Sequence, residues 1–459
     1  MPSEWRCHVK SIQISSALAL TLSLMAGAAH SAVSAEDAAQ LKTTLTPFGA
    51  ERAGNKDGTI PAWTGAPTPN AGLNNGRRSD PFAAEKPLNS ITAKNMAQYS
   101  GQLTEGTKAL LQKYPNTFRV DVYKTHRTAI APQWVYDNTA KNAVNAKLVE
   151  TSSGPVPQGV YGGIPFPIPK SGLEVMWNHQ LRWRGESWHL EGKAYQLTPD
   201  GTWVNVVDAS NDVWMPYYAQ TPEKFNNEYY MIRSLTRGPA IRAGEAITDR
   251  MNLDESKTAA WVYLTGQRRV RKLPNSCCDT LTPFSAGVAT FDEVSVFTGR
   301  LDKFDWKLLG KREMYIPYNA NRALQPAKDS ELLGQHHLNP DFIRWELHRV
   351  WVVEATLKSG ERHTSPKSRY YVDEDSWDAV MAERYDANGQ LARIPFALPV
   401  VMSDVPATEQ INWGVYDLTT GSSFVSGITN ERNAMYVPKR PAFKDATFTP
   451  DAMAGEGVR

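Results

Sequence analysis

Residues 261–274 read WVYLTGQRRVRKLP, a stretch that predicts a β-hairpin at the centre of the fold. Trp261–Leu264 is rich in strand-forming residues, and Thr265-Gly266-Gln267 can turn the chain back. The returning segment carries four bases around Val270, namely Arg268, Arg269, Arg271 and Lys272. An aromatic strand paired with a basic strand gives an apolar body with a cationic rim.

Similar hairpin signals lie upstream of this stretch. Within 188–197 the residues expected on one face are Trp188, Leu190, Gly192 and Ala194. Asp200-Gly201 then favours a turn into a second strand over 202–208. Residues 229–240 and 241–250 predict another hairpin directly before the central one.

Two downstream segments show period-two alternation of large apolar residues. In 305–318 the residues expected on one face are Trp306, Leu308, Met314, Ile316 and Tyr318. In 344–358 they are Trp345, Leu347, Trp351, Val353, Ala355 and Leu357. Such alternation indicates strands that have one covered face and one wet face.

The remaining C-terminal segments continue the β pattern over 369–374, 394–402, 413–419 and 424–429, whereas 377–385 is predicted as a short helix capped by Ser376. About ten or more antiparallel strands with few helices predict a mainly β fold with some α, built as a curved antiparallel sheet or half-open β-barrel. A β-sandwich is the alternative. Large aromatic residues on the covered face fit a sheet wrapped around a helix or a ligand.

The N-terminal third has a different composition. Residues 1–35 resemble a cleavable signal peptide, because Arg6 and Lys10 precede an apolar run that ends in small residues before Glu36; a retained anchor is the alternative. No cysteine follows the run, so lipidation is not expected. We expect residues 36–170 to form an extended and helical arm packed on the main domain, with a disordered linker as the alternative. The β domain would span 171–440 and a tail 441–459.

Composition excludes some classes of protein. The formal net charge of +2 lacks the strong basic excess of a nucleic-acid binder. Cys277 and Cys278 are adjacent, and either a strained vicinal disulfide or two inert thiols fit that spacing. The histidines lack the spacing of a zinc site, and no nucleotide-binding or hydrolase motif is present. We therefore expect no metal, no cofactor and no catalytic residues.

Seven segments resemble a family known as domain of unknown function 1329, often labelled as outer-membrane lipoprotein-sorting proteins. They are LTPFGAERAGNKDGTIPAWTG (45–65), MWNH (176–179), WVYLTGQRRVRKLP (261–274), FDWKLLGKREMYIPYN (304–319), RWELHRVWVVEATLK (344–358), YYVDEDSW (370–377) and YDANG (385–389). More distantly, they are similar to the periplasmic carriers of the Lol system. The resemblance implies a half-open β-barrel with a helical lid, a periplasmic location and a lipid-handling role. It also implies association with exporters of the resistance-nodulation-division type.

The expected apolar cavity draws its candidate residues from the aromatic strands. They are Trp261, Tyr263, Trp306, Leu308, Arg312, Met314, Trp345, Leu347, Arg349 and Trp351. For Trp261 and Tyr263, an ordinary core position is favoured over a place in the cavity wall. Arg312 and Arg349 interrupt apolar faces, where a charge is costly unless it is paired. Each would bind a lipid headgroup, form a structural ion pair or mark a break in the strand register.

The four bases of the hairpin, Arg268, Arg269, Arg271 and Lys272, fit two roles. They would dock on anionic lipid or an acidic partner, or they would protect an edge strand from pairing with another sheet. The favoured hypothesis is a non-enzymatic periplasmic carrier that moves a hydrophobic molecule from an inner-membrane exporter to the outer membrane. An accessory module without lipid is the second hypothesis, and an envelope hydrolase is the third.

Overall fold

The computed structural model describes residues 32–74, 77–273, 277–432 and 436–456. The predicted signal peptide therefore lies almost entirely outside the described residues. The helices are α1 (Ala35–Ala39), α2 (Glu105–Lys113), α3 (Gln133–Asn145), α4 (Gly172–Gln180), α5 (Asp329–Leu332) and α6 (Pro450–Glu456). Within this part of the chain, none of the helices combines the length and the apolar content that crossing a bilayer requires.

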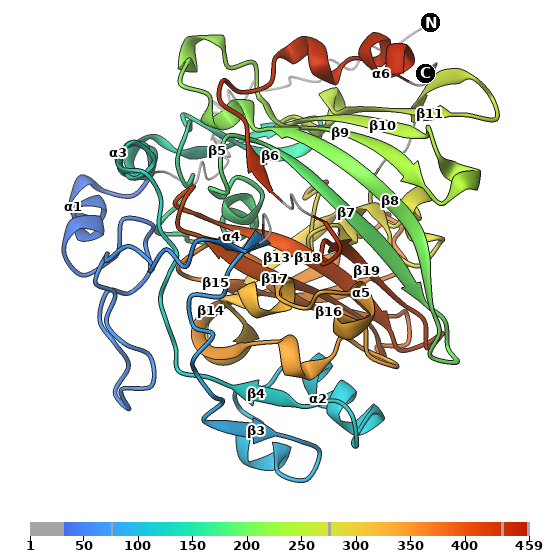
Figure 1. Cartoon of the computed structure of the whole chain (residues 1–459). Helices are drawn as coiled ribbons and strands as arrows, with labels where there is room; N and C mark the ends of the chain where they lie inside the picture. The colour runs from blue at the N-terminus through green and yellow to red at the C-terminus, as the bar shows by residue number, and fades with distance from the viewer. Residues whose placement is uncertain (1–31, 75–76, 274–276, 433–435, 457–459) are drawn as a thin grey trace, which may run out of the picture.

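The main strands form one large curved sheet (Figure 1). Its first half comprises β7 (Ser187–Leu197), β8 (Trp203–Trp214), β9 (Glu228–Gly238), β10 (Ala246–Asn252), β11 (Ala259–Leu264) and β12 (Arg269–Leu273). Its second half comprises β13 (Phe304–Pro317), β14 (Trp345–Leu357), β15 (Lys367–Asp373), β16 (Ala379–Tyr385), β17 (Leu391–Met402), β18 (Ala407–Asp417) and β19 (Ser423–Ile428). Smaller strands are β1 (Leu73–Asn74), β2 (Arg77–Arg78), β3 (Asn89–Ile91), β4 (Val120–Val122), β5 (Lys147–Thr151), β6 (Gly154–Gln158) and β20 (Val437–Pro438).

Each half of the sheet is an antiparallel meander, and the pairing of β7 with β19 joins the halves. Strands β12 and β13 lie at the two ends and do not pair with each other in the described residues, so the sheet is not closed into a barrel. A parallel bridge between Trp345 and Val122 attaches β4, and through it β3. The predicted curved, half-open architecture is confirmed, with this one parallel contact added.

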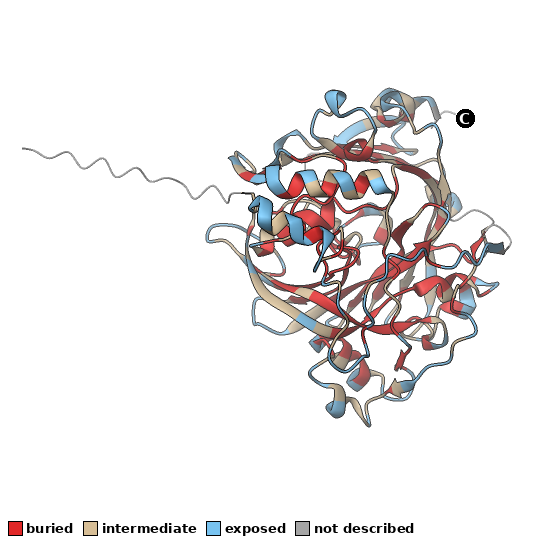
Figure 2. Cartoon of the chain, turned by 90° about the vertical axis from the view of Figure 1, so that its left-hand side faces the viewer, coloured by how far each residue is buried: buried red, intermediate tan, exposed pale blue. Residues whose placement is uncertain are grey.

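Two hydrophobic cores lie on opposite faces of the sheet. On the concave face α4 packs against β13 and β14, and its core extends to α3 and to residues 284–301. On the other face α2 packs against β16 and β17 together with β3 and β4. Helix α3 has both buried and exposed residues, whereas α1 has no buried residue (Figure 2).

The predicted hairpins over 188–208, 229–250 and 261–273 correspond to β7–β8, β9–β10 and β11–β12. The turn between β7 and β8 contains Gly201, whose φ of 92° suits glycine. The predicted helix over 377–385 is wrong, because residues 379–385 form the central strand β16. Residues 379–384 are all buried, and a strand covered on both faces shows no alternation.

The prediction of one continuous apolar face along 305–318 is also wrong. A bulge between Leu308 and Gly310 shifts the pairing of β13 with β14. Trp306 and Leu308 consequently pack on the concave core, whereas Met314 and Ile316 belong to the opposite core. In β14 the apolar residues also divide, with Trp345 and Leu347 in the opposite core and Val353 and Ala355 in the concave one.

Candidate functional site

A cavity of about 220 Å³ lies on the concave face, between strands β7–β10, the end of α4 and residues 284–299; counted with the part that opens to solvent, it holds about 1640 Å³. Its wall is mainly apolar and includes Trp188, Leu190, Ile232, Met251, Phe297 and Trp413. Several of these, such as Leu190, Ile232 and Met251, pack on the concave core yet stay partly exposed. The cavity is therefore an apolar hollow that the protein's own side chains leave partly unfilled.

Small residues on neighbouring strands create this space. Gly192 and Ala194 of β7 line the cavity, and so does Ala209 of β8, which pairs directly with Gly192. Gly427 of β19 also lies in the wall. Because these positions carry at most one side-chain carbon, the sheet surface between the larger aromatic residues is recessed. The face predicted for 188–197 is the one that lines the cavity.

Charged and polar side chains form one end of the cavity. Arg182 and Arg184 follow α4, Glu409 and Gln410 come from β18, and Asp249 comes from β10. We call these five residues the polar end. Arg182 forms an ion pair with Asp378 behind the wall, and Nη1 of Arg184 lies 3.6 Å from Oε1 of Glu409. The Arg184 guanidinium also lies over the Tyr230 ring, 4.7 Å from its centre.

Burial changes the protonation of two acids that line the cavity, Asp249 of the polar end and Glu255. Burial raises the pKa of Asp249 to about 7. Burial, and then the neighbouring Asp249, raise the pKa of Glu255 to about 8. Neither acid has a cation among the described residues close enough to reverse this effect. At neutral pH both carboxyl groups are therefore protonated to a large extent.

The residues predicted for the cavity lie around it rather than in its described lining. Trp261 and Tyr263 of β11 pack with Ala246 and with Met453 of α6. Their strand neighbours Ala260 and Val262 pair with Asp249 and Ile247, which face the cavity. Successive side chains alternate between faces, so Trp261 and Tyr263 lie on the convex side under α6.

The other predicted apolar residues lie behind the cavity wall or farther away. Trp306 contacts Phe297, a wall residue, with ring centres 5.4 Å apart. Leu308 and Trp351 pack on the concave core, whereas Met314 and Leu347 belong to the opposite one. Trp345 lines a separate hollow of about 30 Å³ on that opposite side. The assignment of all these residues to ligand binding stays a prediction.

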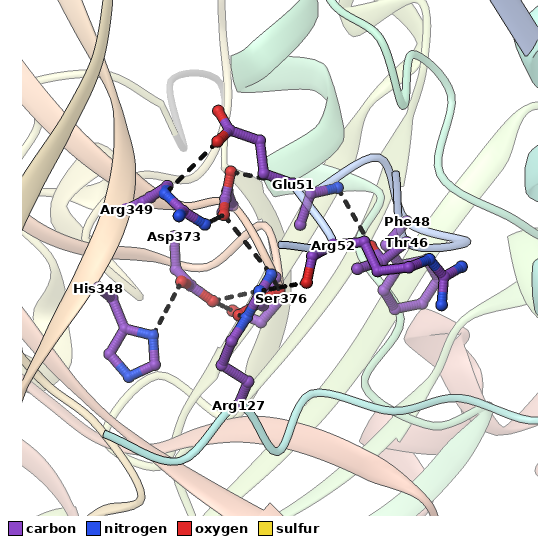
Figure 3. A network of polar contacts seen from close by, with 12 residues as sticks. Thr46, Phe48, Glu51, Arg52, Arg127, His348, Arg349, Asp373 and Ser376 are labelled. Atoms are coloured by element: carbon purple, nitrogen blue, oxygen red, sulfur yellow. Dashed lines mark hydrogen bonds and ion pairs between the residues drawn. The ribbon is translucent and has the colours of Figure 1, made fainter. Parts of the chain in front are cut away.

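The two predicted arginines have different surroundings. Arg312 is exposed, because it follows the bulge in β13. Arg349 is buried in a polar network shown in Figure 3, where its Nη1 lies 3.3 Å from Glu374 and donates to the carbonyl of Ala53. Glu51 lies 3.5 Å from its Nε. Arg349 thus pairs with the N-terminal arm and with the segment after β15, as a structural ion pair would.

The same network contains a group of potential metal ligands. Side-chain atoms of His348, Asp373 and Asp375 lie within 4.8 Å of one another, and all three residues are buried. However, Arg127 already donates to both carboxylate oxygens of Asp375, at 2.7 and 2.8 Å. Burial, and then Asp375, raise the pKa of Asp373 to about 7. This set could hold a cation only if the Arg127–Asp375 pair opened.

The central hairpin presents its bases to solvent. Arg268, Arg269, Arg271 and Lys272 are all exposed on β12 or the turn before it, and β12 is an end strand of the sheet. This position is compatible with docking and with protection of a sheet edge, so both roles stay open. Cys277 and Cys278, just beyond this strand, are free thiols.

Sequence reasoning did not find the polar end. Arg182 and Arg184 lie in a short coil after α4, where no periodic pattern indicates which side chains are buried. Asp249 and Glu409 lie in strands, but a single acid within an apolar strand is not distinguishable from a solvent-facing one. The alternation in 188–197 was the one sequence signal that pointed to the cavity wall.

The fold and the cavity define a class of protein, an open and strongly curved β-sheet that holds a helix and a partly unfilled apolar cavity on its concave side. Within that class, the sequence profile of a family described as "Protein of unknown function (DUF1329)" matches residues 90–454. The chain belongs to this family.

The chain is also similar to several known proteins. Uncharacterized protein PA3922 of Pseudomonas aeruginosa is 40% identical over 452 residues, covering 96% of this chain and 97% of the relative. Among solved structures, a DUF1329 family protein from Desulfovibrio piger has a TM-score of 0.43 at 13% identity and covers 61% of this chain and 97% of its own. LolA superfamily protein NE2245 from Nitrosomonas europaea has a TM-score of 0.36 at 14% identity, covering 62% and 100%.

Proposed function

We propose that the protein is a non-enzymatic carrier that binds a lipid or another hydrophobic molecule in the concave cavity. The observation that carries this proposal is the set of apolar wall residues that remain partly exposed inside a formed hollow. Exposed apolar surface in a concave site favours an apolar ligand. A ligand that buried about ten CH₂ groups would gain about 8 kcal/mol before the costs of association are subtracted, so about micromolar affinity is the upper bound from this burial.

The proposed route leads from an inner-membrane exporter of the resistance-nodulation-division type, through the periplasm, to the outer membrane. Support for this route comes from the resemblance of the signature segments and not from the geometry. The exposed bases of β12 are suited to docking on an anionic lipid surface during loading or delivery. Transfer of this kind requires an affinity between those of the donor and the acceptor.

Native mass spectrometry of the full chain, purified without detergent, tests the carrier proposal. We expect a bound mass that a denaturing spray releases and that lipid extraction recovers. A folded protein that carries no extra mass and does not bind a hydrophobic fluorescent probe at micromolar concentration would overturn the proposal.

A second candidate function is that of an accessory module that bridges an exporter and the outer membrane through its surface. The observation that favours it is the cluster of four exposed bases at an open sheet edge. Replacement of Arg268, Arg269, Arg271 and Lys272 by serine separates the two. Loss of membrane or partner binding with an unchanged cavity ligand indicates docking by a carrier, whereas loss of binding by a protein that never holds a ligand indicates the accessory module.

A further inference from the structure

We infer that the cargo has an apolar body and carries a neutral group that both donates and accepts hydrogen bonds, a hydroxyl or an amide, which binds at the polar end of the cavity. This inference rests on the proposed carrier function and adds the chemical class of the cargo. A pure hydrocarbon, a free carboxylate, a phosphate or an ammonium headgroup would each fit the polar end less well.

The polar end consists of buried groups whose hydrogen bonds are incomplete. The exposed fractions of Arg182, Arg184, Asp249, Glu409 and Gln410 are 2%, 8%, 8%, 7% and 3%. Each has an atom without a hydrogen-bond partner among the described residues: Nη2 of Arg182, Nε of Arg184, Oδ1 of Asp249, Oε2 of Glu409 and Oε1 of Gln410. All five residues line the cavity. Buried polar groups in native proteins are nearly always paired, and a polar group in the cavity that these residues line is the partner we infer for them.

The unpaired atoms are of both kinds. The two arginine nitrogens are donors, and the oxygens of Glu409 and Gln410 are acceptors. Water can satisfy both while the cavity has no cargo, and a cargo group that takes the place of water must do the same. An ammonium group cannot accept, and an ester cannot donate. A hydroxyl or an amide does both.

The charges of the polar end are already balanced. Arg182 pairs with Asp378, and Arg184 pairs with Glu409. Arg184 is held further by its position over the rings of Tyr230 and Trp188. An added anion would find no uncompensated cation here, and it would lie near Asp249, whose own ionisation burial already disfavours. A neutral polar group avoids this cost.

Displacement of N-phenyl-1-naphthylamine from the full chain at pH 7.5 tests the inference with four ten-carbon ligands: decane, decanol, decanoate and decylamine. We expect decanol to displace the probe at a concentration about tenfold lower than the other three, which is the effect of about one satisfied hydrogen bond. Equal displacement by decane and decanol, or preferred binding of decanoate or decylamine, overturns the inference and leaves the carrier function intact. Absence of probe binding and of any displacement instead overturns the carrier function.

A paired variant links the preference to these residues. Arg184→Met with Glu409→Gln removes both members of the ion pair, and we expect the preference for decanol to fall below about threefold while decane binding is unchanged. Arg237→Met with Glu191→Gln is the matched control, because this pair lies in the same sheet with Arg237 half exposed. Gln410→Met is a milder variant that removes one acceptor and is expected to reduce the preference partially. An undiminished preference in both cavity variants assigns the selectivity elsewhere and overturns the inference.

Discussion

A larger side chain introduced into the cavity wall tests most directly whether the space there is unfilled. Ala209 of β8 lines the cavity wall, and Ala382 of β16 is fully buried in the same core without lining the cavity. The same substitution at both positions, Ala209→Leu and Ala382→Leu, therefore adds three carbons either to unfilled space or to packed protein. The two variants differ only in what surrounds the new side chain.

The two substitutions are expected to change the free energy of unfolding in opposite directions. In unfilled space, each added carbon that leaves water stabilises by about 0.8 kcal/mol, so Ala209→Leu is expected to raise the free energy of unfolding by 0 to about 2 kcal/mol. In a packed core, added methylene groups force neighbouring side chains from their preferred rotamers, so Ala382→Leu is expected to lower it by about 1–3 kcal/mol. The gap between the variants is then about 3 kcal/mol.

Urea unfolding followed by tryptophan fluorescence measures both values, and probe binding measures the remaining space. We expect Ala209→Leu to weaken binding of the hydrophobic probe at least tenfold while the protein remains as stable as the parent. Equal destabilisation by the two substitutions, with probe binding unaffected, would show that the interior around Ala209 is packed and would refute the carrier reasoning.

Three further predictions concern the ion pairs of Arg349, the polar end of the cavity and the face under α6. Arg349→Leu is expected to lower the free energy of unfolding by about 3 kcal/mol, because Glu374 would lose one of its buried partners, whereas the exposed Arg312→Leu is expected to change it by less than about 0.5 kcal/mol; equal effects in urea unfolding would contradict the ion-pair assignment. The folded-state pKa of Asp249 lies near 7, above its ordinary value of 3.8, so the stabilisation that its protonated carboxyl contributes is lost as pH rises from about 4 to 7. Asp249→Asn is expected to reduce the fall in the free energy of unfolding over this pH range by up to about 4 kcal/mol. An unchanged pH dependence of stability would refute this assignment. Met453→Ala is expected to cost about 2 kcal/mol and to shift tryptophan emission to the red, since α6 covers Trp261; emission identical to that of the parent would show that the helix does not shield this face.

The sheet was predictable from the sequence because its hairpins carry strong local signals. Asp200-Gly201 fixes one turn, and the basic return of WVYLTGQRRVRKLP marks the end strand. The bulge at Gly310 was not predictable, because a glycine within a strand pattern does not show whether the register shifts there. This one shift separated Met314 from Leu308 and moved Arg312 into solvent.

The sequence predicted an apolar cavity but not its position in the sheet. Aromatic residues attract attention in a sequence, yet Trp261 and Trp345 pack in other cores and do not line this cavity. The hollow lies instead where Gly192, Ala194 and Ala209 are small. A cavity leaves no direct signal in a sequence. Only the pairing of strands far apart along the chain reveals where small residues face one another.

The long crossing between the two end strands has a consequence for how such proteins diversify. Strand β12 ends at Leu273 and β13 begins at Phe304, and part of the intervening chain, residues 284–299, lines the cavity. Connecting segments tolerate insertions and deletions far better than paired strands do. Lengthening or trimming this crossing outside its buried ion pairs, Asp292 with Arg384 and Glu293 with Arg393, would resize the compartment without disturbing the hydrogen-bonded ladder of the sheet. The paired strands of the sheet and this part of the cavity wall are therefore supplied by separate segments of the chain.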